Sequence, residues 1–299
     1  MTMARRLRVL LAENKPLLAA GVFDALSSRI AEDVGYKALH VGGFAVESAL
    51  LGRPDIGMIT LTELTDQVAR ITATVDVPVI VDVDTGFGGV HNVARTVFEL
   101  ERAGAVGLHI EDQIIPKKCP LLDGRVLVPE AVAVSRIKAA LDARRDPDFL
   151  IIARCDADSV SYDELVRRSN LYLEAGADMV LPMLLEHNGA RIETLPPGKL
   201  MALYRQLARD IHGPLLNVMI PPGSELADFR EAGYAMVSNP ATSLQAAANA
   251  MYAVLTEALT NGTGAKYLKD NSQFVPTPRK IMDLMKVGEF ITFEQKHQP

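Results

Sequence analysis

The chain has 299 residues, of which 48% are hydrophobic and 23% are charged, so it holds enough apolar residues for the core of an ordinary soluble globular protein. Its formal net charge of −6 argues against nucleic acid or an anionic membrane as the main partner. A small anionic substrate is not excluded, because a local cluster of cations outweighs net charge at close range.

The two cysteines, Cys119 and Cys155, form neither a disulfide framework nor a zinc motif, which suits a reducing compartment. The N-terminal stretch MTMARRLRVLLAENKP holds an apolar run of only about five residues, too short for the core of a signal peptide. No apolar run approaches the roughly 20 residues that a membrane-spanning helix needs. We therefore expect a soluble, cytoplasmic protein.

Short apolar runs alternate with amphipathic, helix-favouring segments from one end of the chain to the other. Runs of this length with helical patterns between them indicate successive βα units and a parallel sheet. We predict a strand in each of the ranges 18–24, 37–43, 77–84, 105–112, 148–157, 178–184, 214–220 and 234–240.

Four junctions share one form, in which a helix ends, a glycine follows and a strand begins. Each glycine suits the left-handed conformation that ends a helix: Gly35, Gly104, Gly176 and Gly233. Together with the eight strands, this pattern predicts a single (β/α)8 barrel domain over 1–299, with extra C-terminal helices from about 262 to 299. A doubly wound open sheet is the alternative, but no G-x-G-x-x-G motif opens a helix after the first strand.

Carboxylates collect where the third and fourth predicted strands end, and barrel active sites lie at such ends. In VPVIVDVDTGFGG (77–89), Asp82 and Asp84 point the same way because strand side chains alternate, and Glu111 ends the next strand. Like charges at a buried strand end need a cation, and oxygen ligands suit Mg2+ or Mn2+. The alternatives are a turn residue beside a helix cap, or structural ion pairing.

Arg154 ends the otherwise apolar strand IIAR, and two interpretations of it stay open. It is either a buried partner of a barrel carboxylate or a planar fork that binds the carboxylate of a substrate.

With these residues in place, the sequence resembles the isocitrate lyase/phosphoenolpyruvate mutase superfamily. The matching motifs run in order between about residues 17 and 260: GRPDIGMITLTEL (52–64), VPVIVDVDTGFGG (77–89), AVGLHIEDQIIPKKC (105–119) and IIARCDA (151–157). The resemblance implies a barrel whose eighth helix is exchanged between subunits, usually in a homotetramer. It also implies Mg2+ at Asp82, Asp84 and Glu111, and a 2-oxo or 2-hydroxy acid held by Arg154.

In the lyases of this superfamily, the cysteine of the loop after the fourth strand protonates the departing enolate. That position is Cys119, and we expect Lys117 and Lys118 to lower its pKa and to keep it in a polar, exposed loop. The alternative is a small buried hydrophobic residue. Cys155, inside a strand where the family usually has threonine, is interpreted as packing. The glycines after Asp84 are expected to let substrate approach the backbone.

Several positions depart from the lyase pattern and make the pocket more apolar. Leu121 replaces the loop histidine, Gly42 replaces the serine of a Ser-Gly pair, Phe44 replaces a glycine and Met183 replaces a glutamate. His40 stands where lyases often have tyrosine, and it either acts on the substrate hydroxyl or is a satisfied core histidine. The predicted substrate-binding set is Gly42, Gly43, Phe44, Asp55, Arg154, Met183, Asn217 and Asn239.

The resemblance favours a Mg2+-dependent carbon–carbon lyase for an alkyl-bearing 2-hydroxy dicarboxylate, such as 2-methylisocitrate or 2,3-dimethylmalate. The catalytic residues would be Cys119, Lys117, Arg154 and His40. The alternatives are oxaloacetate decarboxylation or hydrolysis, which Gly42-Gly43 and the missing glutamate favour, and a carboxyphosphonoenolpyruvate-type phosphonomutase. A non-catalytic barrel that has lost its activity is the least favoured interpretation, because the metal, arginine and cysteine positions are kept.

Overall fold

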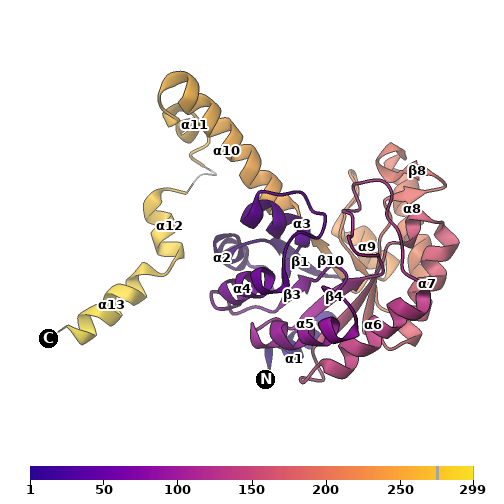
Figure 1. The fold of residues 1–299 in the computed structure, drawn as a ribbon. Coiled ribbons are helices and arrows are strands. Elements are labelled where there is room, and N and C mark those ends of the chain that lie inside the picture. Colours follow the sequence, from indigo (N-terminus) through magenta and orange to yellow (C-terminus); the bar gives the residue numbers. More distant parts are fainter. Residues whose placement is uncertain (274–275, 299) are drawn as a thin grey trace.

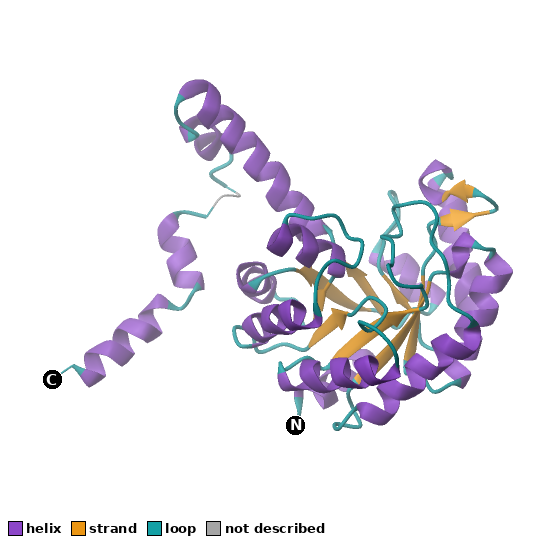
Figure 2. Ribbon diagram, in the orientation of Figure 1, coloured by secondary structure: helices purple, strands orange, loops and turns teal. Residues whose placement is uncertain are grey.

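The computed structural model describes residues 1–273 and 276–298. Eight parallel strands form one sheet in the order β6-β5-β4-β3-β2-β1-β10-β9. A parallel bridge between Val180 and Leu215 joins its two ends, so the sheet curls into a (β/α)8 barrel with helices on the outside (Figures 1 and 2). The predicted barrel is confirmed, and the alternative of an open sheet is wrong.

Each of the eight predicted apolar runs contains one barrel strand. Most of these strands are buried on both faces, as expected of a parallel sheet covered by helices. The strands are β1 (Leu17–Val22), β2 (Leu39–Val41), β3 (Val79–Asp82), β4 (Gly107–Glu111), β5 (Leu150–Cys155), β6 (Met179–Pro182), β9 (Leu216–Asn217) and β10 (Met236–Asn239).

The helices between the strands turn an apolar side to the sheet. They are α2 (Ala25–Val34), α3 (Gly43–Val46) with a π-helical turn (Glu47–Leu51), α4 (Leu61–Thr72), α5 (Val90–Arg102), α6 (Glu130–Ala143), α7 (Tyr162–Glu174), α8 (Pro197–Asp210) and α9 (Leu226–Ala232). The four predicted glycines all end their helices with positive φ, from 89° at Gly104 to 108° at Gly35. Short 3-10 helices span Ala157–Ser159 and Ile192–Thr194.

Helix α1 (Met3–Glu13) packs Ala4 and Leu7 into the core beside the start of the strands. Arg8 of this helix donates to the Asp178 carboxylate over 2.9 Å and so ties α1 to the segment that precedes β6. A small hairpin that the sequence did not predict, β7 (Glu186–His187) with β8 (Ala190–Arg191), follows β6 at the opposite end of the barrel.

The C-terminal helices project from the barrel instead of covering it (Figure 1). They are α10 (Thr242–Asn261), α11 (Ala265–Asp270), α12 (Pro278–Leu284) and α13 (Val287–His297). Within the described part of the chain, α10 buries none of its residues, and Tyr252, Leu255 and Leu259 are 78%, 65% and 89% exposed. The eighth barrel helix predicted from the sequence therefore exists. It contacts its own barrel near its start, where Ser243 donates to the Gly21 carbonyl over 2.6 Å, and then projects away from it.

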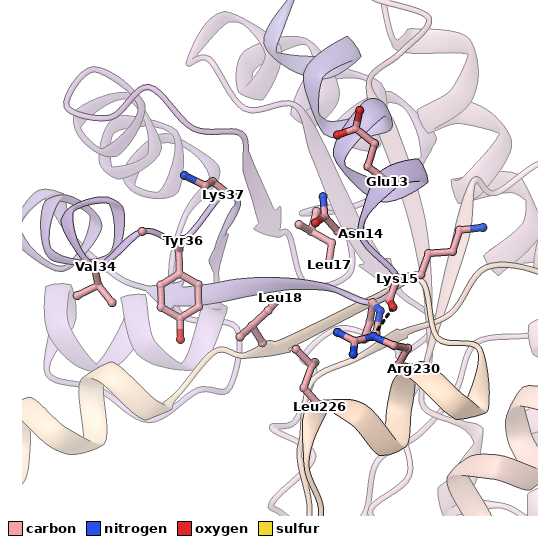
Figure 3. Close-up of a pocket in the computed structure, with 12 residues that line it drawn as sticks. Glu13, Asn14, Lys15, Leu17, Leu18, Val34, Tyr36, Lys37, Leu226 and Arg230 are labelled. Atoms are coloured by element: carbon pink, nitrogen blue, oxygen red, sulfur yellow. Dashed lines mark hydrogen bonds between the residues drawn. The ribbon is translucent and has the colours of Figure 1, made fainter.

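A cavity of about 530 Å³, which we call the β1 groove, opens beside the start of β1. Figure 3 shows Val34 and Tyr36 on one side of the groove, Leu226 and Arg230 on the other, and Leu18 between them. It lies at the N-terminal ends of the strands, away from the predicted site. No helix within 1–273 and 276–298 is long and apolar enough to cross a membrane.

Candidate active site

A cavity of about 350 Å³ lies at the C-terminal ends of the barrel strands. Parallel strands bring their last residues to one end of a barrel, so side chains distant in the sequence meet there. Ten of the predicted site residues line this cavity: His40, Gly42, Gly43, Phe44, Asp55, Asp82, Cys119, Arg154, Met183 and Asn239.

The three carboxylates predicted to bind metal are buried next to two cations. Arg154 Nη2 lies 3.0 Å from Glu111 Oε2, and Arg154 Nη1 lies 3.7 Å from Asp82 Oδ2. Lys117, from the loop that carries Cys119, contacts both the Asp84 carboxylate, over 2.8 Å, and the Asp55 carboxylate. Lys117 reaches these strand ends because the loop that carries it folds back over them.

Gly43 explains how the backbone comes so close to these carboxylates. Its N–H donates to Asp82 Oδ2 over 3.3 Å, and a Cβ atom there would lie 3.3 Å from an oxygen of Asp82 and of Asp84. By contrast, Gly86, Gly88 and Gly89 do not line the cavity. Gly86, with φ of 84°, serves the turn after β3, so the structure gives these glycines a role in the turn and not in the cavity wall.

The carboxylate cluster fits a divalent cation by charge. Among the described residues, no three His, Cys, Asp or Glu side chains converge as a finished metal site. However, Asp84 Oδ1 and both carboxylate oxygens of Glu111 are buried and accept no well-formed hydrogen bond from the described residues. Burial raises the pKa of Asp84 to about 7 and raises that of Glu111 as well. Lys117 and Arg154 compensate these carboxylates only in part, and Mg2+ or Mn2+ would provide further positive charge.

Arg154 combines the two interpretations that the sequence left open. Its Nε and Nη2 donate to the Asp156 carboxylate over 2.9 and 3.0 Å, so the side chain is a buried ion-pair partner. Its third nitrogen, Nη1, donates no hydrogen bond to the described residues, and the side chain lines the cavity. The guanidinium is thus fixed on one edge and keeps a donor on the other.

Cys119 lies in an ordered loop whose two ends are paired by a bridge between Gln113 and Leu127. Its backbone N–H donates to the Asp55 carbonyl over 3.1 Å, and Arg191 donates to the carbonyl of Pro120 over 3.1 Å. Cys119 is buried at 7% exposure, so the expectation of an exposed loop cysteine is wrong. Burial, and then the Asp55 charge, raise the pKa of Cys119 to about 12, contrary to the lowered pKa expected from the lysines.

His40 is a buried residue with both ring nitrogens engaged. Its Nε2 lies 2.8 Å from His109 Nε2, and its Nδ1 lies 3.0 Å from Ser238 Oγ. Burial lowers the pKa of His40 to about 3, so the ring is uncharged at neutral pH. These contacts support the interpretation of His40 as a satisfied core histidine that forms part of the cavity wall.

The rest of the cavity wall is mostly apolar. Met183, which stands where a glutamate was expected, is joined by side chains that follow β6 and β9: Leu185, Val218, Met219 and Ile220. Asn239 lines the cavity as predicted, but Asn217 does not. The Asn217 amide turns back and donates to the Met219 carbonyl, so the structure does not place it in the cavity wall.

Sequence reasoning missed two polar residues near the cavity. His109 lies two positions before Glu111 on β4 and therefore on the same face, a signal that was present in the sequence. Arg125 lies in the Cys119 loop, with its side chain fully buried against Asp156 and Asp158. Nothing in its local sequence signals this burial, because the path of the loop determines it.

With this geometry established, comparison with known proteins identifies the family. Residues 7–259 match the phosphoenolpyruvate phosphomutase family. The chain is 42% identical to a 2-methylisocitrate lyase of Aeropyrum pernix over 262 residues, which cover 86% of this chain and 80% of that protein. It is 35% identical to a 2,3-dimethylmalate lyase of Eubacterium barkeri, with 97% of both chains covered.

Comparison with solved structures supports the same family. A phosphoenolpyruvate phosphomutase from Streptomyces platensis superimposes with a TM-score of 0.86 at 30% identity, covering 98% of this chain and 99% of the other. A phosphonopyruvate hydrolase in complex with oxalate and Mg2+ superimposes with a TM-score of 0.84 at 26% identity, covering 99% of both. The predicted family is confirmed: the chain belongs to the isocitrate lyase/phosphoenolpyruvate mutase superfamily of enzymes.

Proposed function

We propose that this protein is a divalent-metal-dependent carbon–carbon lyase for a small 2-hydroxy di- or tricarboxylate that carries an alkyl group, of the 2,3-dimethylmalate or 2-methylisocitrate kind. The observation that carries the proposal is the composition of one cavity. A free arginine donor, a cysteine thiol and an apolar wall all line it. The relatives that match most of the chain are lyases for substrates of this kind.

Cleavage of such a substrate breaks the bond between its hydroxyl-bearing carbon and the next carbon. The hydroxyl gives its proton to solvent water and becomes the carbonyl of a 2-oxo acid, while the bonding electrons pass to the other fragment as an enolate. Arg154 Nη1 would bind the carboxylate next to the new carbonyl. The Cys119 thiol, which holds its proton at neutral pH, would deliver that proton to the enolate carbon.

Asp82, Asp84 and Glu111 would hold the cation. When bound, Mg2+ or Mn2+ supplies positive charge that stabilises negative charge developing on the oxygens of the oxyacid. Lys117 neutralises part of the same carboxylate cluster. Met183, Leu185 and Val218 would receive the alkyl group, since burial of a methyl group against an apolar wall is favourable.

We further propose that the protein assembles through α10. The helix exposes Tyr252, Leu255 and Leu259, and the β1 groove of the same chain presents Leu18, Val34 and Leu226. If α10 of a second copy bound in the β1 groove, the apolar surfaces of both the helix and the groove would be removed from water. We favour a homotetramer built from two such pairs, located in the cytoplasm. Residues from about 262 onward would form additional helices.

A substrate panel with Mg2+ tests the proposed reaction. 2-Methylisocitrate should give pyruvate and succinate, and 2,3-dimethylmalate should give pyruvate and propionate, both measured by mass spectrometry. We expect one of them to exceed isocitrate in kcat/KM by about tenfold or more, because one alkyl carbon in an apolar pocket contributes roughly 1–3 kcal/mol. Isocitrate as the best substrate would contradict the apolar-pocket argument. Oxalate from oxaloacetate, or phosphate from phosphonopyruvate, as the dominant product would replace the lyase by the corresponding hydrolase.

A further inference from the structure

Arg125 is a buried cation of the loop that carries Cys119. The loop leaves the barrel after Gln113 and returns at Leu127, where the two residues pair. The side chain of Arg125 is 0% exposed, although its neighbours Gly124 and Val126 are exposed on the surface. A buried guanidinium loses hydration, so it stays buried only where carboxylates compensate.

Three carboxylates surround Arg125. Its Nη1 and Nη2 donate to the two oxygens of Asp158 over 2.7 and 3.2 Å, and Nη2 donates to Glu186 over 2.9 Å. Asp158 also accepts the backbone N–H groups of Leu185 and Glu186. Arg125 therefore fastens the Cys119 loop to the segments that follow β5 and β6.

The third carboxylate, Asp156, connects Arg125 to the cavity. Asp156 Oδ1 accepts from Arg125 Nη1 over 3.3 Å and from Arg154 Nη2 over 3.0 Å. The backbone N–H of Asp156 donates to Asp112 over 2.9 Å, which fixes the position of this carboxylate from behind. Arg125 thus touches the group that orients Arg154, but it does not itself line the cavity.

We infer that Arg125 is a positioning residue that holds the Cys119 loop closed over the cavity and, through Asp156, sets the orientation of Arg154. A lysine at this position would keep the charge but would not reach Asp156, Asp158 and Glu186 together, because it lacks the planar fork of arginine. The contacts of Arg125 alone support its role in holding the loop closed. Its role in orienting Arg154 for catalysis rests on the proposed function.

The reactivity of two cysteines reports loop closure independently of activity. Cys119 lies in the loop and is 7% exposed, whereas Cys155 lies inside β5 and is 0% exposed. Iodoacetamide labelling of each thiol, measured by mass spectrometry of the full-length protein after digestion, therefore separates opening of the loop from unfolding of the barrel. The variants are Arg125→Gln and Arg125→Lys. Arg144→Gln is the matched control, because Arg144 pairs with Asp178 outside the loop.

We expect Cys119 to be labelled about tenfold faster or more in Arg125→Gln, at an intermediate rate in Arg125→Lys and at the wild-type rate in Arg144→Gln. Cys155 should stay protected in all of them. Unchanged labelling of Cys119 in a folded Arg125→Gln variant overturns the inference. If both cysteines are labelled in Arg125→Gln, that variant has unfolded and Arg125→Lys is the test. Faster labelling of Cys119 alone in Arg125→Lys supports the role of Arg125 in loop closure, and labelling at the wild-type rate overturns it.

Kinetics test the role of Arg125 in orienting Arg154. With 2-methylisocitrate or 2,3-dimethylmalate, Arg125→Lys should lower kcat more than it raises KM, because Cys119 and Arg154 are misplaced while the cavity remains. A change confined to KM would overturn this role. If the wild-type protein cleaves neither compound, the proposed function fails, while the labelling rates still decide the role of Arg125 in loop closure.

Discussion

The Nζ atom of Lys117 lies 2.8 Å from Oδ1 of Asp84, so a loop lysine shares the carboxylate cluster that we assign to a divalent cation. Although Lys117 and Arg154 lie nearby, buried oxygens of Glu111 and Asp84 accept no well-formed hydrogen bond from the described residues. The two cations thus compensate the cluster only in part, and the metal assignment can be tested directly.

Asp82→Ala should weaken Mg2+ binding by at least about 10-fold while the protein remains folded. The substitution removes one negative charge and one oxygen ligand from the proposed site. Isothermal titration calorimetry of Mg2+ into both proteins measures the effect. Asp66→Ala, a substitution within helix α4 away from the cavity, serves as the control. Equal Mg2+ affinity in wild type and Asp82→Ala would remove Asp82 from the metal site.

Arg154→Lys should reduce kcat/KM for the best substrate by roughly 30- to 5000-fold, which corresponds to about 2–5 kcal/mol for a buried charge pair. A lysine cannot bind Asp156 by two nitrogens and keep a donor in the cavity at the same time. Steady-state kinetics on both proteins give the ratio, with Arg144→Lys as a matched exchange outside the site. A wild-type kcat/KM would rule out the assigned role of Arg154.

Cys119→Ser should reduce carbon–carbon cleavage by roughly 10²- to 10⁴-fold, the usual contribution of a general acid. The hydroxyl keeps the size of the thiol but gives up a proton less readily. Mg2+ binding should be retained, because the thiol is not among the carboxylates assigned to the cation. Cleavage at the wild-type rate would exclude Cys119 as the acid and would favour hydrolysis or decarboxylation.

The raised pKa of Cys119, about 12, also predicts its pH dependence. Only the thiolate reacts with iodoacetamide, and its fraction at pH 7.5 should be about three orders of magnitude below that of a thiol with an ordinary pKa. In the wild-type protein, the labelling rate of Cys119 should therefore rise about tenfold per pH unit from pH 7 to 10, without levelling off. A plateau near pH 9 would mean that the thiol titrates normally.

Disruption of the exposed face of α10 tests the assembly. Leu255→Asp combined with Leu259→Asp should lower the native mass measured by light scattering, and Val34→Asp in the β1 groove should act in the same direction. Val160→Asp replaces an exposed apolar residue elsewhere on the barrel and should leave the mass unchanged. A monomeric wild-type protein would contradict the proposed exchange of α10.

The parts of the fold set by local patterns could be predicted from the sequence, and the parts set by loop paths could not. The parallel order of β3, β4 and β5 placed their last residues, Asp82, Glu111 and Arg154, at one end of the barrel, as found. Alternation does not say where a loop goes. The contact of Lys117 with Asp84 and the burial of Cys119 both depend on how the chain between Gln113 and Leu127 folds back.

Short strands also limit prediction. β9 has only two residues, and Asn217 at its end turns to the Met219 carbonyl instead of the cavity. The pattern PLLNVMI gave no sign of that turn, because the competing hydrogen bond is made to the backbone two residues later. His109, by contrast, could have been found from its spacing to Glu111 on a strand that was correctly placed.

Only Pro240 and Ala241 separate β10 from α10, so the direction in which α10 projects is fixed by the barrel itself. If α10 binds the β1 groove of a second copy, as proposed, one chain carries both halves of that contact in a set orientation. If two copies bind reciprocally, α10 of each copy occupies the β1 groove of the other, and assembly through this contact stops at a closed pair. A change in the length of this connection would misalign the two halves and convert the closed pair into open-ended, head-to-tail polymers.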